Sequence, residues 1–158
     1  MIQQSAGLLL YRFKNETPQF FLVHPGGPYW AKKEISAWSI PKGELGPTEH
    51  PLEAAIREMK EETGISLDIP VEYFIRLSPV KQNPGKMIYA WALQSDIEPS
   101  PIKSNVFEME WPPRSGKKKQ FPEIDKADWF NFAEARKRIV IGQVPLLEEI
   151  NQRLKKST

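Results

Sequence analysis

The sequence contains no cysteine and only two histidines, His24 and His50. The lack of cysteine excludes disulfides, thiolate metal sites and a cysteine nucleophile, so any metal must bind oxygen or imidazole ligands. Long apolar runs are also missing, because the longest, Leu8 to Tyr11, is far too short to span a bilayer. The first five residues carry no basic segment of the kind that begins a signal peptide. We therefore expect a cytoplasmic protein without membrane contact.

An excess of charge of one sign is missing as well. The chain has 22 Lys and Arg against 20 Asp and Glu, a formal net charge of +2, which gives no argument for duplex nucleic acid or a membrane surface as partner. Its 158 residues are enough for one ordinary domain and few for two. We expect residues 1–158 to form one domain, and nothing in the sequence indicates an oligomeric state.

Hydrophobic runs between turn residues predict an α/β (α+β) fold with a mixed sheet. The expected strands cover 5–13, 19–24, 37–40, 71–80, 86–94 and 128–132, and the expected helices cover 51–63, 133–141 and 145–155. Residues 99–122 are rich in Pro, Ser and Lys and have little periodicity. We interpret them as one long functional or mobile loop, in which 105–111 is a candidate edge strand.

The helix at 51–63 has the clearest ends. Pro51 suits the first helical position, Glu53 lies where the helix dipole favours an anion, and Gly64 follows the last periodic residue as a left-handed cap does. His50 is assigned to the start of this helix, and His24 to an ordinary structural role.

Three carboxylates share one face of that helix. At about 100° per residue, Glu58, Glu61 and Glu62 fall within an arc of roughly 100°, and apolar residues lie opposite. Like charges one turn apart cost a few tenths of a kcal/mol, a repulsion that a divalent cation relieves. Oxygen ligands suit Mg²⁺, with Mn²⁺ as the alternative. On these residues alone, an ordinary solvated helix surface explains the pattern equally well.

The longer segment from Gly43 to Ile65 separates these alternatives. It resembles the Nudix box, which reads Gly, five residues, Glu, seven residues, Arg-Glu, an aliphatic-type residue, any residue, Glu-Glu, any residue, Gly and an aliphatic residue. Every position fits. The resemblance implies the Nudix α/β/α sandwich, with strands before and after the box and closing helices.

The resemblance also implies roles for the residues of the box. Glu58 and Glu62 would be the main metal ligands, Glu61 would hold a second metal or help to deprotonate water, and the Gly43 carbonyl would complete the coordination. Arg57 would form a supporting ion pair with Glu49. The implied reaction is hydrolysis of a phosphoanhydride bond in a nucleotide-like substrate by a metal-activated water, without a covalent intermediate or an organic cofactor.

A second resemblance bears on the substrate. The stretch from Trp38 to Gly43 is similar to the one that leads into the box of asymmetrical diadenosine tetraphosphate hydrolases and of diphosphoinositol polyphosphate hydrolases, which implies that Lys42 meets a phosphate. The strand with Tyr89 and Trp91 looks like the former group's strand, where aromatic residues flank the substrate. Packing in the core explains Tyr89 and Trp91 equally well.

The region before the last predicted strand offers further candidates. Lys117 and its basic neighbours suit a long polyphosphate, although a solvated loop is the alternative. Glu123 precedes Trp129 at a spacing similar to that of a glutamate in diadenosine tetraphosphate hydrolases, which implies a further active-site carboxylate. Glu108 and Glu110 compete for this role, and a surface ion pair would also explain Glu123.

Several functions remain open. A dinucleoside polyphosphate such as diadenosine tetraphosphate is the first expectation for the substrate, and a nucleoside triphosphate or the 5′ end of RNA is the alternative. A catalytically silent, nucleotide-sensing Nudix domain should lack some box carboxylates, and none is missing. A nucleic-acid-binding module would need a basic face with aromatic residues, for which Trp111 and the lysine-rich loop are the candidates.

Overall fold

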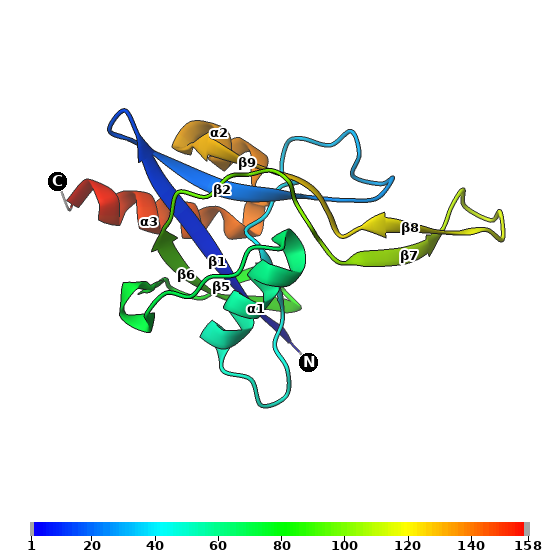
Figure 1. Ribbon diagram of the computed structural model, residues 1–158, viewed down its shortest axis with the longest axis horizontal. Coiled ribbons are helices and arrows are strands. Elements are labelled where there is room, and N and C mark those ends of the chain that lie inside the picture. The colour runs from blue at the N-terminus through cyan, green and yellow to red at the C-terminus, as the bar shows by residue number, and fades with distance from the viewer. Residues whose placement is uncertain (1, 157–158) are drawn as a thin grey trace.

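A mixed sheet lies at the centre of the structure, a computed structural model that describes residues 2–156 (Figure 1). Its strand order is β4-β6-β1-β2-β9, with β3 paired to β1 and β5 paired to β6. The β1–β6 pair is parallel and the other pairs are antiparallel, as the sequence predicted for a mixed sheet. The strands are β1 (Gln3–Lys14), β2 (Thr17–Pro25), β3 (Lys42–Glu44), β4 (Ile75–Arg76), β5 (Val80–Asn83), β6 (Lys86–Gln94) and β9 (Ile124–Asn131).

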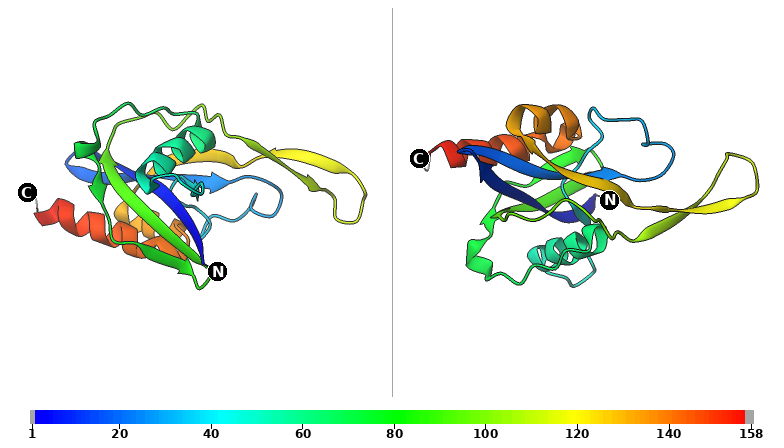
Figure 2. Two further views of the ribbon diagram at one scale, coloured as in Figure 1. Left: turned by 90° about the horizontal axis from the view of Figure 1, so that it is seen from below. Right: turned by 45° about the horizontal axis from the view of Figure 1, so that its top comes forward.

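Helices cover both faces of this sheet (Figure 2). α1 (Pro51–Thr63) lies on one face, and α2 (Phe132–Arg138) and α3 (Val144–Lys156) lie on the other. Alternate residues of β1 divide between two cores: Leu8 packs in the cluster that contains Met59 of α1, and Leu9 packs in the cluster that contains Leu147 of α3. Within residues 2–156, no helix is long and apolar enough to cross a membrane.

The ends of α1 agree with the sequence prediction. Leu52 N–H donates a hydrogen bond to Nδ1 of His50 (3.2 Å), which gives this histidine the expected position at the helix start. Gly64 ends the helix with φ 83°, and its N–H donates to the Lys60 carbonyl (2.7 Å). Only glycine adopts this left-handed conformation without strain, so the helix ends where the box places its last glycine.

The prediction of a long loop at 99–122 was wrong, because part of this segment forms a β-hairpin. β7 (Val106–Glu110) pairs with β8 (Lys118–Pro122) in a separate two-stranded sheet that projects from the rest of the molecule (Figure 1). The candidate edge strand at 105–111 is therefore a strand, but it does not join the central sheet. The rings of Phe107 and Phe121 face each other across the hairpin at 5.9 Å, a long-range pairing that the sequence alone did not indicate.

Three other predictions need correction. The segment 37–40 forms only isolated bridges, Val23 with Ser39 and Trp38 with Ile139. The segment 71–80 divides into a 3₁₀ turn (Val71–Tyr73) and the short β4 and β5, since Pro79 has no N–H for a continuous ladder. α2 ends at Arg138 because Ile139 is extended and bridges to Trp38, and a second 3₁₀ turn (Ile141–Gln143) follows.

Candidate active site

Arg57 lies in the middle of the carboxylate face of α1. Its Nε and Nη2 donate to the two carboxylate oxygens of Glu49 (2.7 and 2.8 Å), which is the ion pair that the box implied. The hydrogen bonds from Arg57 lower the pKa of Glu49 to about 2. The Nη1 atom of Arg57 donates to Glu58 (2.7 Å) and to Glu61 (3.0 Å). One guanidinium therefore holds three carboxylates in a fixed arrangement, as its planar fork of donors allows.

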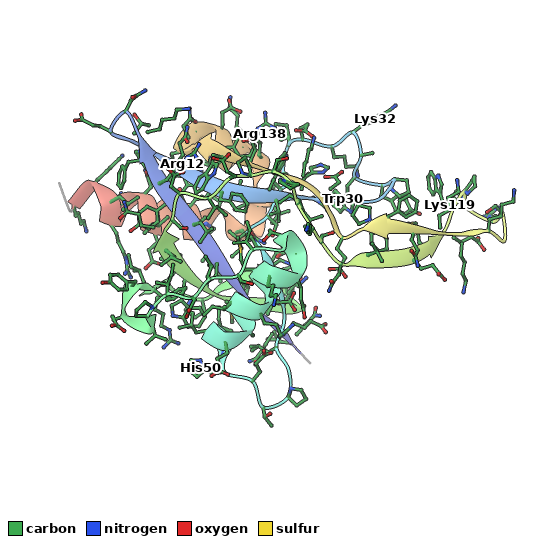
Figure 3. All side chains as sticks on the ribbon, in the orientation of Figure 1. Arg12, Trp30, Lys32, His50, Lys119 and Arg138 are labelled. Carbon is green, nitrogen blue, oxygen red and sulfur yellow. The ribbon has the colours of Figure 1, made fainter. Side chains whose placement is uncertain are left out.

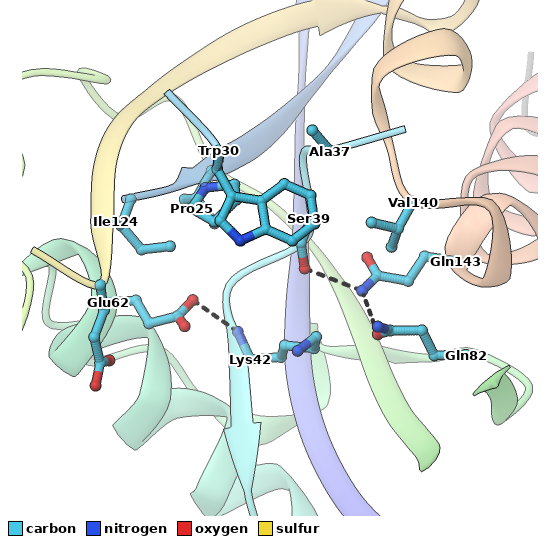
Figure 4. Close-up of a pocket in the computed structure, with 12 residues that line it drawn as sticks. Pro25, Trp30, Ala37, Ser39, Lys42, Glu62, Gln82, Ile124, Val140 and Gln143 are labelled. Carbon is cyan, nitrogen blue, oxygen red and sulfur yellow. Dashed lines mark hydrogen bonds between the residues drawn. The ribbon is translucent and has the colours of Figure 1, made fainter. Parts of the chain in front are cut away.

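Glu62, the fourth carboxylate, meets Lys42 (Figure 4). The Lys42 backbone N–H donates to Oε1 of Glu62 at 3.1 Å. Burial raises the pKa of Glu62, and the negative charges of Glu58 and Glu123 add to this effect. Burial lowers the pKa of Lys42, and the positive charge of Lys86 adds to that. The site therefore holds a desolvated carboxylate whose charge would be stabilised by a bound cation.

Gly43 brings the backbone of β3 against the carboxylate of Glu58. A methyl group added to Gly43 would overlap that carboxylate, so only glycine permits this close approach. Burial raises the pKa of Glu58, Arg57 opposes this shift, and the charge of Glu61 adds to it. Among residues 2–156, no three His, Asp or Glu side chains converge closely enough to form a ready-made metal site. The donors at hand are nevertheless oxygens with unfavourable like charges, a set that fits a hard divalent cation.

Two cavities of about 240 and 450 Å³ open beside Glu62. Both are lined by Pro25, Trp30, Glu62 and Glu123. The smaller one reaches Lys42 and the polar side chains drawn in Figure 4, and the larger one lies between the loop 25–36 and the hairpin β7–β8. The shared lining makes them neighbouring parts of one site, with Glu62 and Glu123 where they meet.

Glu123 reaches this site through backbone contacts at the start of β9. Its carbonyl accepts a hydrogen bond from Gly26 N–H, and its N–H donates to the Asn105 carbonyl, both at 2.8 Å. Neither competitor lines the two cavities. Glu108 pairs with Lys118 (3.8 Å), and Glu110 accepts a hydrogen bond from Arg114 N–H (2.7 Å). The structure thus brings Glu123, rather than either competitor, to the carboxylates of α1.

The structure does not bring the other expected substrate contacts to these cavities. Trp91 is 7% exposed and lies in the core beneath α1. The hydroxyl of Tyr89 accepts a hydrogen bond from the side chain of Gln4 (3.3 Å). Lys117 lies on the hairpin, where its N–H donates to the hydroxyl of Ser115 (3.1 Å). None of the three lines either cavity.

Sequence reasoning missed two residues that shape the site. Trp30 lies in the loop 25–36, remains 38% exposed, and lines both cavities. Gln143 is fully buried: its Nε2 donates to Ser39 and Gln82, and its Oε1 accepts from Ile40 N–H, all at 3.0 Å. Neither residue belongs to a periodic sequence pattern that would have identified it, because Trp30 lies in a Pro-Gly loop and Gln143 stands alone between two helices.

His24 anchors the loop that carries Trp30. It is fully buried, and its Nδ1 contacts Asp125 at 2.8 Å while its Nε2 contacts the Lys33 carbonyl at 2.7 Å. Each ring nitrogen thus has an oxygen partner, one on the strand β9 and one in the loop 25–36. The loop is held again at Glu34, which accepts from Arg138 (2.8 Å) and pairs with Lys126 (3.0 Å). Trp30 therefore belongs to a loop that is fixed at two points.

Comparisons with known proteins agree with this architecture. A family model described as the NUDIX domain matches residues 1–150. The asymmetrical bis(5′-nucleosyl)-tetraphosphatase of Rattus norvegicus is 34% identical over 100 residues, which is 58% of this chain and 64% of that relative. The RNA pyrophosphohydrolase of Erythrobacter litoralis is 49% identical over 37 residues, 23% of each chain. The solved structure of a C. elegans Ap4A hydrolase binary complex aligns with TM-score 0.65 over 98% of this chain and 99% of that one, at 22% identity, and so shares the fold.

Proposed function

From the premise that the chain belongs to the NUDIX family, we propose that it hydrolyses a phosphoanhydride bond of a nucleoside polyphosphate with Mg²⁺, or alternatively Mn²⁺, as cofactor. One observation carries the proposal. Glu62 from α1 and Glu123, which directly precedes β9, line the same cavities, and Lys42 lies beside them. Carboxylates from two elements next to a lysine form a site for a metal and a phosphate together. The proposal treats residues 1–158 as one Nudix hydrolase domain.

The metal would be held by Glu58, Glu61, Glu62 and the Gly43 carbonyl. When bound, it would neutralise the charge on phosphate oxygens and lower the pKa of a bound water. Arg57 orients Glu58 and Glu61 from the side without being a ligand itself, which is the usual role of a group behind the metal-binding residues.

The proton transfer is assigned to Glu123. Its carboxylate lies in the cavity, and the helix carboxylates would hold the metal, so Glu123 is left to accept a proton from water. The water oxygen forms a bond to phosphorus as the bridging anhydride bond breaks, and the second phosphate leaves with the electron pair. Lys42 binds a phosphate oxygen near this point, and the exposed ring of Trp30 offers a face for a nucleobase.

Replacement of Glu62 by Gln tests the proposal. This change removes charge but little volume, so the fold should persist while hydrolysis of diadenosine tetraphosphate at saturating Mg²⁺ falls by about 100-fold or more. Glu53→Gln is the matched control, because Glu53 is an exposed glutamate in the first turn of the same helix. Near-normal turnover by the Glu62→Gln protein would refute the metal assignment.

A dinucleoside polyphosphate is the proposed preferred substrate. The rat tetraphosphatase supports this choice, as do the two neighbouring cavities, which are both lined by Glu62. We expect kcat/KM to be higher for diadenosine tetraphosphate than for ATP, and a clear preference for ATP would contradict the choice. The 5′ end of RNA is the second candidate, supported by the Erythrobacter relative. Nucleotide binding without hydrolysis of any of these substrates would instead support a nucleotide-sensing role.

A further inference from the structure

The hairpin β7–β8 has two chemically different faces. Cross-strand partners share a face, and the register pairs Phe107 with Phe121 and Met109 with Lys119. One face, here called the aromatic-basic face, consists of Phe107, Met109, Trp111, Lys117, Lys119 and Phe121. The opposite face carries both glutamates of the hairpin together with Lys118 and Gln120. All acidic side chains of β7 and β8 therefore lie on one side.

The aromatic-basic face continues directly from the candidate active site. Phe107 and Met109 line the larger cavity together with Glu62 and Glu123. Further out, the ring of Trp111 contacts Tyr29 of the loop 25–36 (6.1 Å, edge to face). The four steps along the strand from Phe107 to Trp111 cover about 13 Å, which leaves room for several stacked bases at about 3.4 Å each. Aromatic surface thus extends outward from the carboxylates.

The cations of this face are exposed and unpaired. Within residues 2–156, the ammonium groups of Lys117 and Lys119 have no hydrogen bond or ion pair, whereas Lys118 on the other face pairs with Glu108. Figure 3 shows Lys119 out on the hairpin, further from the body of the molecule than Trp30. Lysines between aromatic rings, with no carboxylate on the same face, match a ligand that has both phosphates and bases.

We infer that the aromatic-basic face, together with Tyr29 and Trp30, binds single-stranded RNA. Bases stack on the rings, Lys117 and Lys119 contact backbone phosphates, and the 5′ polyphosphate points towards Glu62 and Glu123. The orientation of the RNA rests on the proposed function, but the binding surface does not. The larger cavity is lined by Phe107 and Met109 but by neither Lys117 nor Lys119, so the face extends beyond the cavity and adds a polynucleotide to the ligands of this site.

The first test measures binding without hydrolysis. A labelled single-stranded RNA of about ten nucleotides with a 5′ triphosphate is titrated into the protein in EDTA by fluorescence anisotropy, at several salt concentrations. Lys119→Ala should weaken binding several-fold and reduce the slope of log K against log salt by about 0.7, the value for one lost phosphate contact on a single strand. Lys118→Ala is the matched control, since it removes the adjacent lysine from the opposite face, and should leave affinity and slope unchanged.

A second arm tests stacking. Trp111→Leu should weaken binding of the RNA about fivefold or more, because stacking on an aromatic ring is lost. An abasic ribose-phosphate oligomer of equal length should bind the wild-type protein much more weakly than the RNA does. The inference is overturned if the RNA does not bind, if Lys118→Ala and Lys119→Ala weaken it equally, or if the abasic oligomer binds as well as the RNA.

Failure of this inference differs from failure of the proposed function. If the surface is wrong, the wild-type protein still hydrolyses diadenosine tetraphosphate with Mg²⁺, and RNA binding does not depend on the hairpin. If the hydrolase proposal is wrong, RNA binding in EDTA still depends on Lys119 and Trp111, although no substrate is cleaved.

Discussion

Replacement of Glu62 by Gln should stabilise the metal-free protein as well as inactivate it. Glutamine keeps an oxygen that can accept the hydrogen bond from Lys42 N–H, and it resembles the protonated carboxyl group. The wild-type side chain must instead carry its charge in a desolvated place once the pH exceeds its raised pKa. We therefore expect the free energy of unfolding in EDTA to be higher for the variant, and the difference to grow as the pH rises.

The size of this effect follows from the pKa of Glu62. Burial, with Glu58 and Glu123 adding to it, raises this pKa from the ordinary value of 4.5 to about 8. Because the folded pKa is above the unfolded one, the stability contributed by the proton is fully present below about pH 4.5 and is lost as the pH rises through about 8. At 1.36 kcal/mol per unit, the upper limit is about 5 kcal/mol. Relaxation of the site and water that enters it relieve part of the desolvation, so we expect a smaller difference, about 1–2 kcal/mol at pH 9.

Thermal unfolding followed by circular dichroism measures the effect. For a chain of this length, the expected gap in Tm at pH 9 is about 2–8 °C, shrinking towards zero at about pH 5. Glu53→Gln should show no such trend, because its carboxylate is exposed. A gap that stays constant or shrinks as the pH rises would refute the claim that Glu62 is desolvated. Mg²⁺ should raise the Tm of the wild type but not that of the Glu62→Gln variant.

Three further substitutions test other parts of the site. Glu123→Gln should lower kcat at least about tenfold with little change in KM, as loss of a general base does. If the activity of this variant stays within about twofold of the wild type from pH 6 to 9, Glu123 lies outside the mechanism. Gly43→Ala should reduce hydrolysis at least about tenfold, because its methyl group would displace Glu58. Gly85→Ala is the control and should leave kcat/KM unchanged, because a methyl group added there meets nothing closer than 3.7 Å. His24→Phe should destabilise the protein by about 1–3 kcal/mol in urea unfolding, because it removes both hydrogen bonds of the ring, and an unchanged midpoint would show that these bonds contribute nothing.

The sequence alone determined the parts of this protein that depend on local order. The bounds of α1 follow from Pro51 and Gly64, and its carboxylate face follows from the 3.6-residue period. β6 was also predicted with the bounds that it has, since its apolar run lies between clear turn residues. The spacing of the box residues required no tertiary information either, because all of them lie in one segment of 23 residues.

Only the tertiary structure decided what lies opposite that helix. Glu123 is 61 positions from Glu62 in the chain, and it reaches the site because its backbone pairs with Gly26 and Asn105. Trp30 lines both cavities because His24 anchors its loop, and Gln143 lines the smaller one because a buried amide network holds it. Such contacts depend on which distant segments pack together, and composition and periodicity describe only neighbours along the chain. The two faces of the hairpin likewise depend on a cross-strand register, since a shift of one residue would have mixed lysines, glutamates and aromatic rings.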